Sequence, residues 1–293
     1  MNTQRPISIA KVRSTQFAIE RQRGVTLIEL MISLGISLVL IAAVGAVFFA
    51  SNQSSRTAQD AARIQETGRY ALDLIGRNLR QAGYINIPFG SGTVATAFTG
   101  TPITTVSSAC PAAPTMAFAI QYQGIAGELD CQAQAITGQI VQQTFFIGVD
   151  ATTGTFSLRC NAVQAATPPT PPTACPTAAA ATNDNILLDN IEDLRILYGS
   201  DTSGNQSVDS YSATPANWSK VVTARVCVLV RSDSESATER QGSVSSPQTY
   251  FNCDGALGTA TGAARYTTAT DTRQRRAFVA TFALRNRISS TPD

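Results

Sequence analysis

The amino-acid sequence of 293 residues contains no histidine, and only 14% of its residues are charged. An average soluble domain carries about 25%. The absence of histidine excludes Ser-His-Asp and Cys-His nucleophilic sites, His-ligated metal centres and a His general base. The remaining neighbours with reactive side chains, such as Glu192–Asp193 and Ser219–Lys220, match no catalytic arrangement. We therefore expect a protein that is not an enzyme and needs no cofactor.

Positive charge is concentrated at the start of the chain. Residues 1–24 hold five basic residues and one acid, so the rest of the chain has a net charge of −2 in place of +2. Residues 25–50 are predominantly apolar and carry a single charge, Glu29. A helix of these 26 residues is about 39 Å long and exceeds the roughly 30 Å of a bilayer core. Basic residues before such a span predict a cytoplasmic N-terminus and a translocated body.

Two simple interpretations of residues 25–50 are a secretory signal peptide and a plain signal anchor. The apolar run is too long for a signal peptide, and no small-residue cleavage pattern closes it. A plain anchor does not account for Glu29, because a charge at the centre of a membrane costs about 2.5–3.5 kcal/mol and usually marks a function. The acid therefore indicates a specialised membrane segment.

The residues around Glu29 resemble the class III signal of type IV prepilins: basic residues, Gly24, then Val25-Thr26-Leu27-Ile28-Glu29-Leu30 and a long apolar helix. The resemblance implies that a prepilin peptidase cleaves after Gly24 and methylates the new N-terminus, Val25. Glu29 then matches the family's acid, which pairs with the N-terminal amine of a neighbouring subunit. The chain departs from the family in beginning with Val25 where Phe is usual. An uncleaved anchor and an unpaired Glu29 at the interface are the alternatives.

Helical periodicity continues beyond the apolar run. Apolar residues recur at spacings of three and four from Ala58 to Ala82, and no proline occurs in residues 25–87. We expect one helix from about Val25 to Ala82, ended by Gly83. Its second half is expected to pack on a head domain, with a partner-binding surface as the alternative.

The remainder of the chain is typical of short strands and loops. The strands are expected at 116–123, 140–149, 154–159, 194–198, 221–231 and 277–285. Residues 161–183, rich in Pro, Ala and Thr, are expected to form a loop. The predicted fold class is α+β, with a long N-terminal helix packed on an antiparallel β-sheet head. The predicted divisions are a leader (1–24), a transmembrane half-helix (25–50), an amphipathic half-helix (51–83) and a head (84–293).

Four segments resemble the PilW family of type IV pilus minor pilins, which is related to the J-type minor pseudopilins. They are residues 68–84, 190–194, 218–232 and 283–287. The resemblance implies a minor pilin that helps to start pilus assembly and stays near the tip. Its implied partners are the prepilin peptidase, other minor pilins, the major pilin and a tip adhesin. Its implied location is the bacterial inner membrane, with a periplasmic head, and then the pilus. A J-type pseudopilin of a type II secretion system and a membrane-anchored module that binds DNA or a surface ligand are the alternatives.

Six cysteines lie in the part of the chain expected to be translocated, where they predict disulfides. Six cysteines allow fifteen pairings. The sequential pairing, which closes short loops, is Cys110–Cys131, Cys160–Cys175 and Cys227–Cys253. A metal site is disfavoured because no CxxC spacing and no histidine are present.

Two further polar clusters have simple interpretations. Asp201, Ser203, Asn205 and Asp209 alternate oxygen ligands as calcium loops do, but without the Gly and distal Glu of an EF-hand, so a polar turn is favoured over weak Ca²⁺ binding. Several arginines lie near the C-terminus: Arg273, Arg275, Arg276, Arg285 and Arg287. Exposed strand ends are favoured there over a DNA-binding patch, so nucleic acid is not an expected partner.

Overall fold

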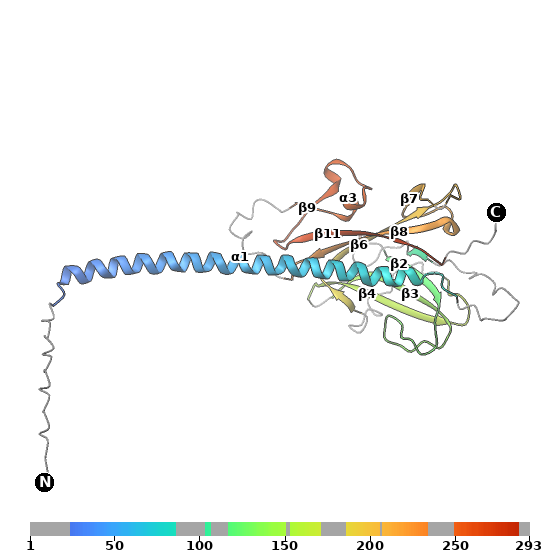
Figure 1. The fold of residues 1–293 in the computed structure, drawn as a ribbon, viewed down its shortest axis with the longest axis horizontal. Coiled ribbons are helices and arrows are strands. Elements are labelled where there is room, and N and C mark those ends of the chain that lie inside the picture. The colour runs from blue at the N-terminus through green and yellow to red at the C-terminus, as the bar shows by residue number, and fades with distance from the viewer. Residues whose placement is uncertain are drawn as a thin grey trace, which may run out of the picture. The chain divides into compact units, whose positions relative to one another are not determined.

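The structure is a computed structural model that describes residues 24–85, 103–106, 117–150, 153–170, 186–205, 207–233 and 249–286. The chain divides into two compact units, residues 1–52 and residues 53–293. Helix α1, Leu27–Gln81, begins in the first unit and ends in the second (Figure 1).

Helix α1 confirms the long N-terminal helix and places its end close to the expected residue. Gly83 has a φ of 75°, the left-handed conformation that glycine adopts without steric cost, and it stops the helix. The Gly83 N–H then donates to the Gln121 carbonyl at 2.8 Å, so the chain leaves the helix directly onto the sheet.

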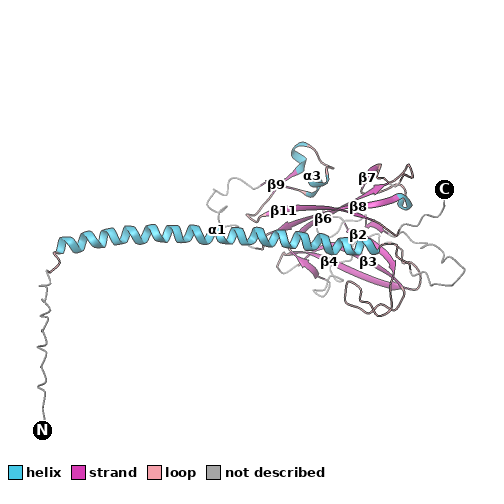
Figure 2. Ribbon diagram, in the orientation of Figure 1, coloured by secondary structure: helices cyan, strands magenta, loops and turns pink. Residues whose placement is uncertain are grey.

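The head contains two larger antiparallel sheets and a strand pair (Figure 2). The first sheet has the order β1-β2-β3-β4-β5 and the second the order β11-β8-β6-β7, while β9 pairs with β10. The strands of the first sheet are β1 Ile103–Val106, β2 Ala117–Gln123, β3 Ile140–Val149, β4 Phe156–Ala165 and β5 Ile186–Asp189. The others are β6 Ile191–Ser200, β7 Ser210–Ser212, β8 Val221–Arg231, β9 Thr249–Phe251, β10 Tyr266–Thr268 and β11 Arg275–Ala283. Short helices occupy Trp218–Lys220, Cys253–Leu257 (α3) and Gly262–Arg265. The α+β class, with a helix and antiparallel sheets, is confirmed.

One core joins the second half of α1 to both larger sheets. Ile64, Ala71, Ile75 and Leu79 of α1 are buried there with inward side chains such as Phe145 of β3 and Val228 of β8. The apolar stripe therefore belongs to the core of the head from Ile64 to Ala82, as its spacing predicts, whereas Ala58 and Ala62 at its start are exposed.

Two glycines allow β11 to approach α1 closely. A Cβ on Gly68 would overlap the ring of Phe278, and a Cβ on Gly76 would overlap the ring of Phe282. Both rings come from one face of β11, since they are four residues apart on a strand. The absence of two side chains on the helix thus creates the space that the two aromatic rings fill.

The loop expected at 161–183 begins later than predicted, because its first five residues belong to strand β4 of the first sheet. Strand β4 continues to Ala165, and its register pairs Gln143 with Ala162 and Ile140 with Ala165. Hydrogen bonding to a long neighbour extends β4 into a sequence whose composition predicts a loop. The rest of that segment, from residue 171 onward, lies outside the described residues.

The disulfides agree with the sequential pairing at one bridge and overturn it at another. Cys227 of β8 is bonded to Cys253 of α3, as expected, with Cα atoms 5.7 Å apart. Cys131 is bonded to Cys160 of β4, with Cα atoms 6.3 Å apart, so the pairs Cys110–Cys131 and Cys160–Cys175 are wrong.

The physical reason for this correction is the position of the loop between β2 and β3. The Gln132 Oε1 atom accepts the backbone N–H of Ala162 at 2.9 Å, which holds this loop against β4. Folding therefore brings Cys131 to Cys160, although each of these two cysteines has another cysteine closer to it in the sequence. Cys110 and Cys175 lie outside the described residues.

Candidate functional site

The first residues of α1 form a capped helix terminus. The backbone N–H of Glu29 donates to Thr26 Oγ1 at 3.3 Å, and the N–H of Leu30 donates to the Thr26 carbonyl at 3.1 Å. Thr26 is thus the N-cap, and Glu29 is the third residue of the helix, the spacing of a capping box. The carboxylate lies in the first turn, where the helix dipole favours negative charge.

Gly24 and Val25 precede the helix and are exposed. A Cβ on Gly24 would meet no atom within 4 Å, and the residue is not in the left-handed region. The fold therefore places no demand for glycine at this position.

The apolar part of α1 is exposed and packs on no other described segment of the chain. Its large side chains from Leu27 to Phe49 are at least half exposed, for example Leu27 at 79% and Phe49 at 73%. Among the described residues, α1 is the one helix that is both long enough and apolar enough to cross a membrane. The hydroxyls of Ser33 and Ser37 donate to carbonyls of the preceding turn, so neither needs water.

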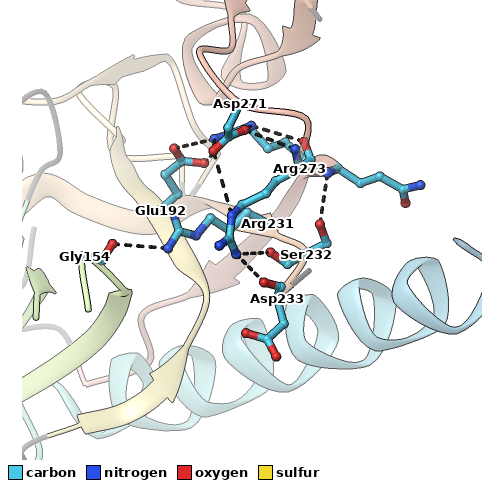
Figure 3. Close-up of polar contacts among 9 residues, drawn as sticks. Gly154, Glu192, Arg231, Ser232, Asp233, Asp271 and Arg273 are labelled. Carbon is cyan, nitrogen blue, oxygen red and sulfur yellow. Dashed lines mark hydrogen bonds and ion pairs between the residues drawn. The ribbon is translucent and has the colours of Figure 1, made fainter. Parts of the chain in front are cut away.

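The head carries a second set of charged residues, centred on Arg275. Figure 3 labels its two acidic partners, Glu192 and Asp271. The guanidinium donates to both oxygens of Glu192, at 2.5 and 3.2 Å, and to both oxygens of Asp271, at 2.5 and 2.9 Å. Its side chain is only 4% exposed. Burial alone would lower the pKa of Arg275, but the bonds to Asp271 and Glu192 outweigh it and raise that pKa. The bond from Arg275 also lowers the pKa of Asp271.

Arg273 and Arg231 extend this cluster toward a pocket. Arg273 donates to the carbonyls of Ser232 and Asp233, and Arg231 donates to the Gly154 carbonyl at 3.3 Å (Figure 3). Burial and the charge of Arg273 lower the pKa of Arg231, which lines a pocket of about 520 Å³ beside α1.

A second ion-pair group lies on the neighbouring part of β6. Arg195 contacts Asp193 at 3.2 Å and Asp254 of α3 at 3.3 Å. Burial raises the pKa of Asp193 to about 6, although the charge and hydrogen bond of Arg195 act in the opposite direction. Together with the Cys227–Cys253 bridge, these contacts attach α3 to the sheet.

Two family models match the chain. The model of the prokaryotic N-terminal methylation motif matches residues 20–45, and that of the type IV pilus-assembly protein W, PilW, matches residues 144–286. The chain belongs to the PilW family. No curated protein and no solved structure matches the chain.

The family assignment confirms the resemblance seen in the sequence. The methylation motif includes the capped start of α1, while the PilW match runs from β3 to just beyond β11 and includes the Arg275 and Arg195 groups. This PilW-family chain is a pilin of the type IV pilus system. A pilin interacts with other pilus components, is processed by the prepilin peptidase, and is anchored in the inner membrane before the pilus assembles.

The predicted calcium ligands form a turn with internal hydrogen bonds. Asp209 accepts the N–H groups of Thr202 and Ser203 at 2.8 and 2.9 Å, and Asp201 accepts the Gly204 N–H at 2.7 Å. The bonds from Thr202 and Ser203 lower the pKa of Asp209 to about 2. Asn205 is bonded to Ser207 at 2.9 Å. No cluster of three or more metal-ligating side chains occurs in the described parts of the chain, and weak Ca²⁺ binding, the less favoured interpretation of this segment, stays untested.

The C-terminal arginines do not all match the exposed strand ends that the sequence suggests. Arg275 is buried and Arg273 half-buried, each with carboxylates nearby, whereas Arg276 and Arg285 are exposed. Arg287 lies outside the described residues. Sequence reasoning misses Glu192 as the partner of Arg275 because 83 residues separate the two.

Proposed function

We propose that the protein is a minor pilin that takes part in the initiation of type IV pilus assembly and resides near the pilus tip. The observation that carries the proposal is a capped, apolar helix whose large side chains are exposed from Leu27 to Phe49. Such a surface is stable only in lipid or among other apolar helices. The match of the head to a pilus-assembly family supports a final position of this helix among the apolar helices of other pilins.

Processing is proposed to occur after Gly24, with methylation of the new N-terminus at Val25. Two observations support this position: the methylation motif includes residues 20–45, and the fold itself gives no reason for glycine at residue 24. A residue that folding does not require is explained by recognition in the site of the peptidase, where a side chain would be excluded. The peptide bond to be cut also lies ahead of the N-cap, Thr26, in non-helical chain.

Glu29 is proposed to select the register of the helix within the assembly. Its side chain is exposed in the first turn of α1. An unpaired carboxylate is costly in an apolar environment, and a buried partner of opposite charge offsets part of that cost. The free amine of a processed Val25 on a neighbouring subunit supplies that partner.

The proposed topology places the N-terminus in the cytoplasm before processing and the head in the periplasm. Basic residues before the apolar run support this orientation, and the two described disulfides support an oxidising compartment for the head. The head then presents its surface to other minor pilins, the major pilin and a tip adhesin. In this role the protein acts by assembly rather than by catalysis.

Mass spectrometry of the mature N-terminus and a count of surface pili test the proposal together. The expected mature protein begins with methylated Val25, and a strain without the protein forms far fewer pili while the major pilin accumulates in the membrane. An intact Met1 would contradict the processing. A normal number of pili in the deletion strain would contradict the role in initiation.

A further inference from the structure

Strand β11 is the outermost strand of its sheet. The strand order is β11-β8-β6-β7, and β11 pairs with β8 along all nine of its residues without a register shift (Figure 2). Its other edge faces away from the sheet. Its exposed residues include Arg276, Val279, Thr281 and Ala283.

The bonds at the two ends of β11 show which backbone groups point outward. Gln274 accepts the N–H of Ser232 at 2.8 Å, and Leu284 donates its N–H to the Val222 carbonyl at 2.9 Å, so even-numbered residues face β8. Along an antiparallel strand, the backbone N–H and C=O groups of successive residues point alternately to one neighbouring strand and to the other side. The odd-numbered residues Ala277, Val279, Thr281 and Ala283 therefore direct their N–H and C=O groups to the outer edge. No backbone hydrogen bond from another described segment reaches these four residues.

Within the described residues, this edge lacks the charges, prolines and bulges by which proteins normally protect edge strands. Residues 277–283 read AFVATFA and contain no charge, proline or glycine. Charge occurs only at the two ends, where Arg276 and Arg285 are exposed. Within the described residues, Arg276 lies over the ring of Phe278 and neither arginine has an ion pair.

We propose that the outer edge of β11 binds an extended segment of a partner polypeptide. The middle of this segment is uncharged, and an acidic side chain lies at each of its ends. Four outward peptide groups supply main-chain hydrogen bonds, as in strand addition, and the two arginines set the charge preference. A second copy of the chain is disfavoured as the occupant, because pairing of two β11 strands would place like charges close together. The inference rests on the geometry of the head and does not require the proposed role in pilus initiation.

Peptide binding to the full-length protein in detergent micelles tests this inference. The probe is a synthetic peptide of alternating Val and Thr with Asp at each end, and the control peptide has Lys at each end. We expect the Asp-ended peptide to bind at least about tenfold more tightly and to slow amide exchange in residues 277–283. Failure of both peptides to bind, or equal binding of the two, would overturn the proposal.

Variants of the edge separate strand addition from other modes of binding. Val279→Pro removes an outward N–H and leaves the bonds to β8 intact, so binding should be lost, whereas Val279→Thr should bind normally. Thr281→Lys, which keeps every N–H, should also abolish binding. Arg276→Glu combined with Arg285→Glu should reverse the peptide preference. Unchanged amide exchange in β6 verifies the fold of each variant. A dimer of the protein alone that Val279→Pro dissociates would overturn the proposal by assigning the edge to a second copy.

Discussion

Arg275 of β11 reaches across the intervening strand β8 to bind both carboxylate oxygens of Glu192 on β6. It binds Asp271 in the same two-point manner, so one buried guanidinium connects three segments of the head. Fork-shaped pairing of this kind is specific to arginine.

Replacement of this arginine should be costly for the head. Arg275→Met leaves Glu192 and Asp271 without a counter-charge and is expected to lower the free energy of unfolding by about 3 kcal/mol. Denaturation of the full-length protein in micelles measures the change. Arg276→Met, which replaces the exposed arginine next to Arg275 in β11, is the matched control and should change stability by less than about 0.5 kcal/mol. Equal effects of the two variants would contradict the role of the Arg275 cluster.

Asp193 should make the stability of the head depend on pH. Its pKa in the folded protein is raised to about 6 by burial, so folding favours the protonated form. The stabilisation is therefore complete below the unfolded-state pKa, near 3.8, and is lost as the pH rises through 6. We expect this group to contribute about 1 kcal/mol more stability at pH 5 than at pH 7.5.

The variant Asp193→Asn isolates this contribution. Relative to the unmodified protein, it should be less stable at pH 5 than at pH 7.5, because it lacks the group that becomes protonated. Asp189→Asn, an exposed acid on β5, serves as the control. Parallel pH profiles for the Asp193→Asn variant and the unmodified protein would exclude the effect.

Glycine-to-alanine substitutions should have opposite effects in the two halves of α1, because Gly68 and Gly76 lie against aromatic rings and Gly45 does not. Gly76→Ala places a methyl group against the ring of Phe282 and is expected to destabilise the head by about 1–3 kcal/mol. Gly45→Ala has open space around it and should be neutral or stabilising, since alanine favours helix. Thermal denaturation measures both, and Phe282→Leu should restore part of the loss in Gly76→Ala. A neutral Gly76→Ala would show that the contact yields easily.

Glu29→Ala should leave membrane insertion intact and remove the protein from pili. The reason is that the substitution makes the span more apolar while deleting the proposed partner of the N-terminal amine. Quantification in membranes and in sheared pili checks the prediction. Ser37→Ala, two turns further along the exposed helix, should enter pili normally. Wild-type amounts of the Glu29→Ala protein in sheared pili would refute the register role.

Peptide mapping without reduction should recover two linked pairs, Cys131–Cys160 and Cys227–Cys253. The mapping fails to support the fold if Cys131 is found linked to Cys110, or Cys160 to Cys175. Replacement of Cys253 by Ser should cost about 2–4 kcal/mol, the usual effect of losing a native bridge.

Local sequence signals explain which parts of the protein could be anticipated. The capped start of α1, its end at Gly83 and the alternating strand β8 depend on neighbouring residues, and the sequence predicts each of them. The Cys227–Cys253 bridge joins consecutive cysteines 26 residues apart, as the sequential pairing assumes. Resemblance to PilW was visible at short stretches in both halves of the chain.

The features that escaped prediction all depend on distant contacts. Cys131 meets Cys160 because Gln132 holds a loop on β4, and Arg275 meets Glu192 because β11 and β6 flank the same strand. Strand β4 extends to Ala165 because β3 offers a partner there. None of these contacts leaves a pattern in the local sequence, since each is fixed only when the sheets form.

The fit of Phe278 and Phe282 into the glycine notches of α1 joins the earliest helix of the chain to a strand that is synthesised last among the described elements. Until residues 275–283 have been synthesised, the surface of α1 at Gly68 and Gly76 therefore lacks the two rings that cover it. A chain that ends before residue 275 would therefore leave this part of the helix exposed to water. We expect such a truncated chain to be less stable than the complete head, because it lacks one strand of the second sheet and the two rings that pack on the core.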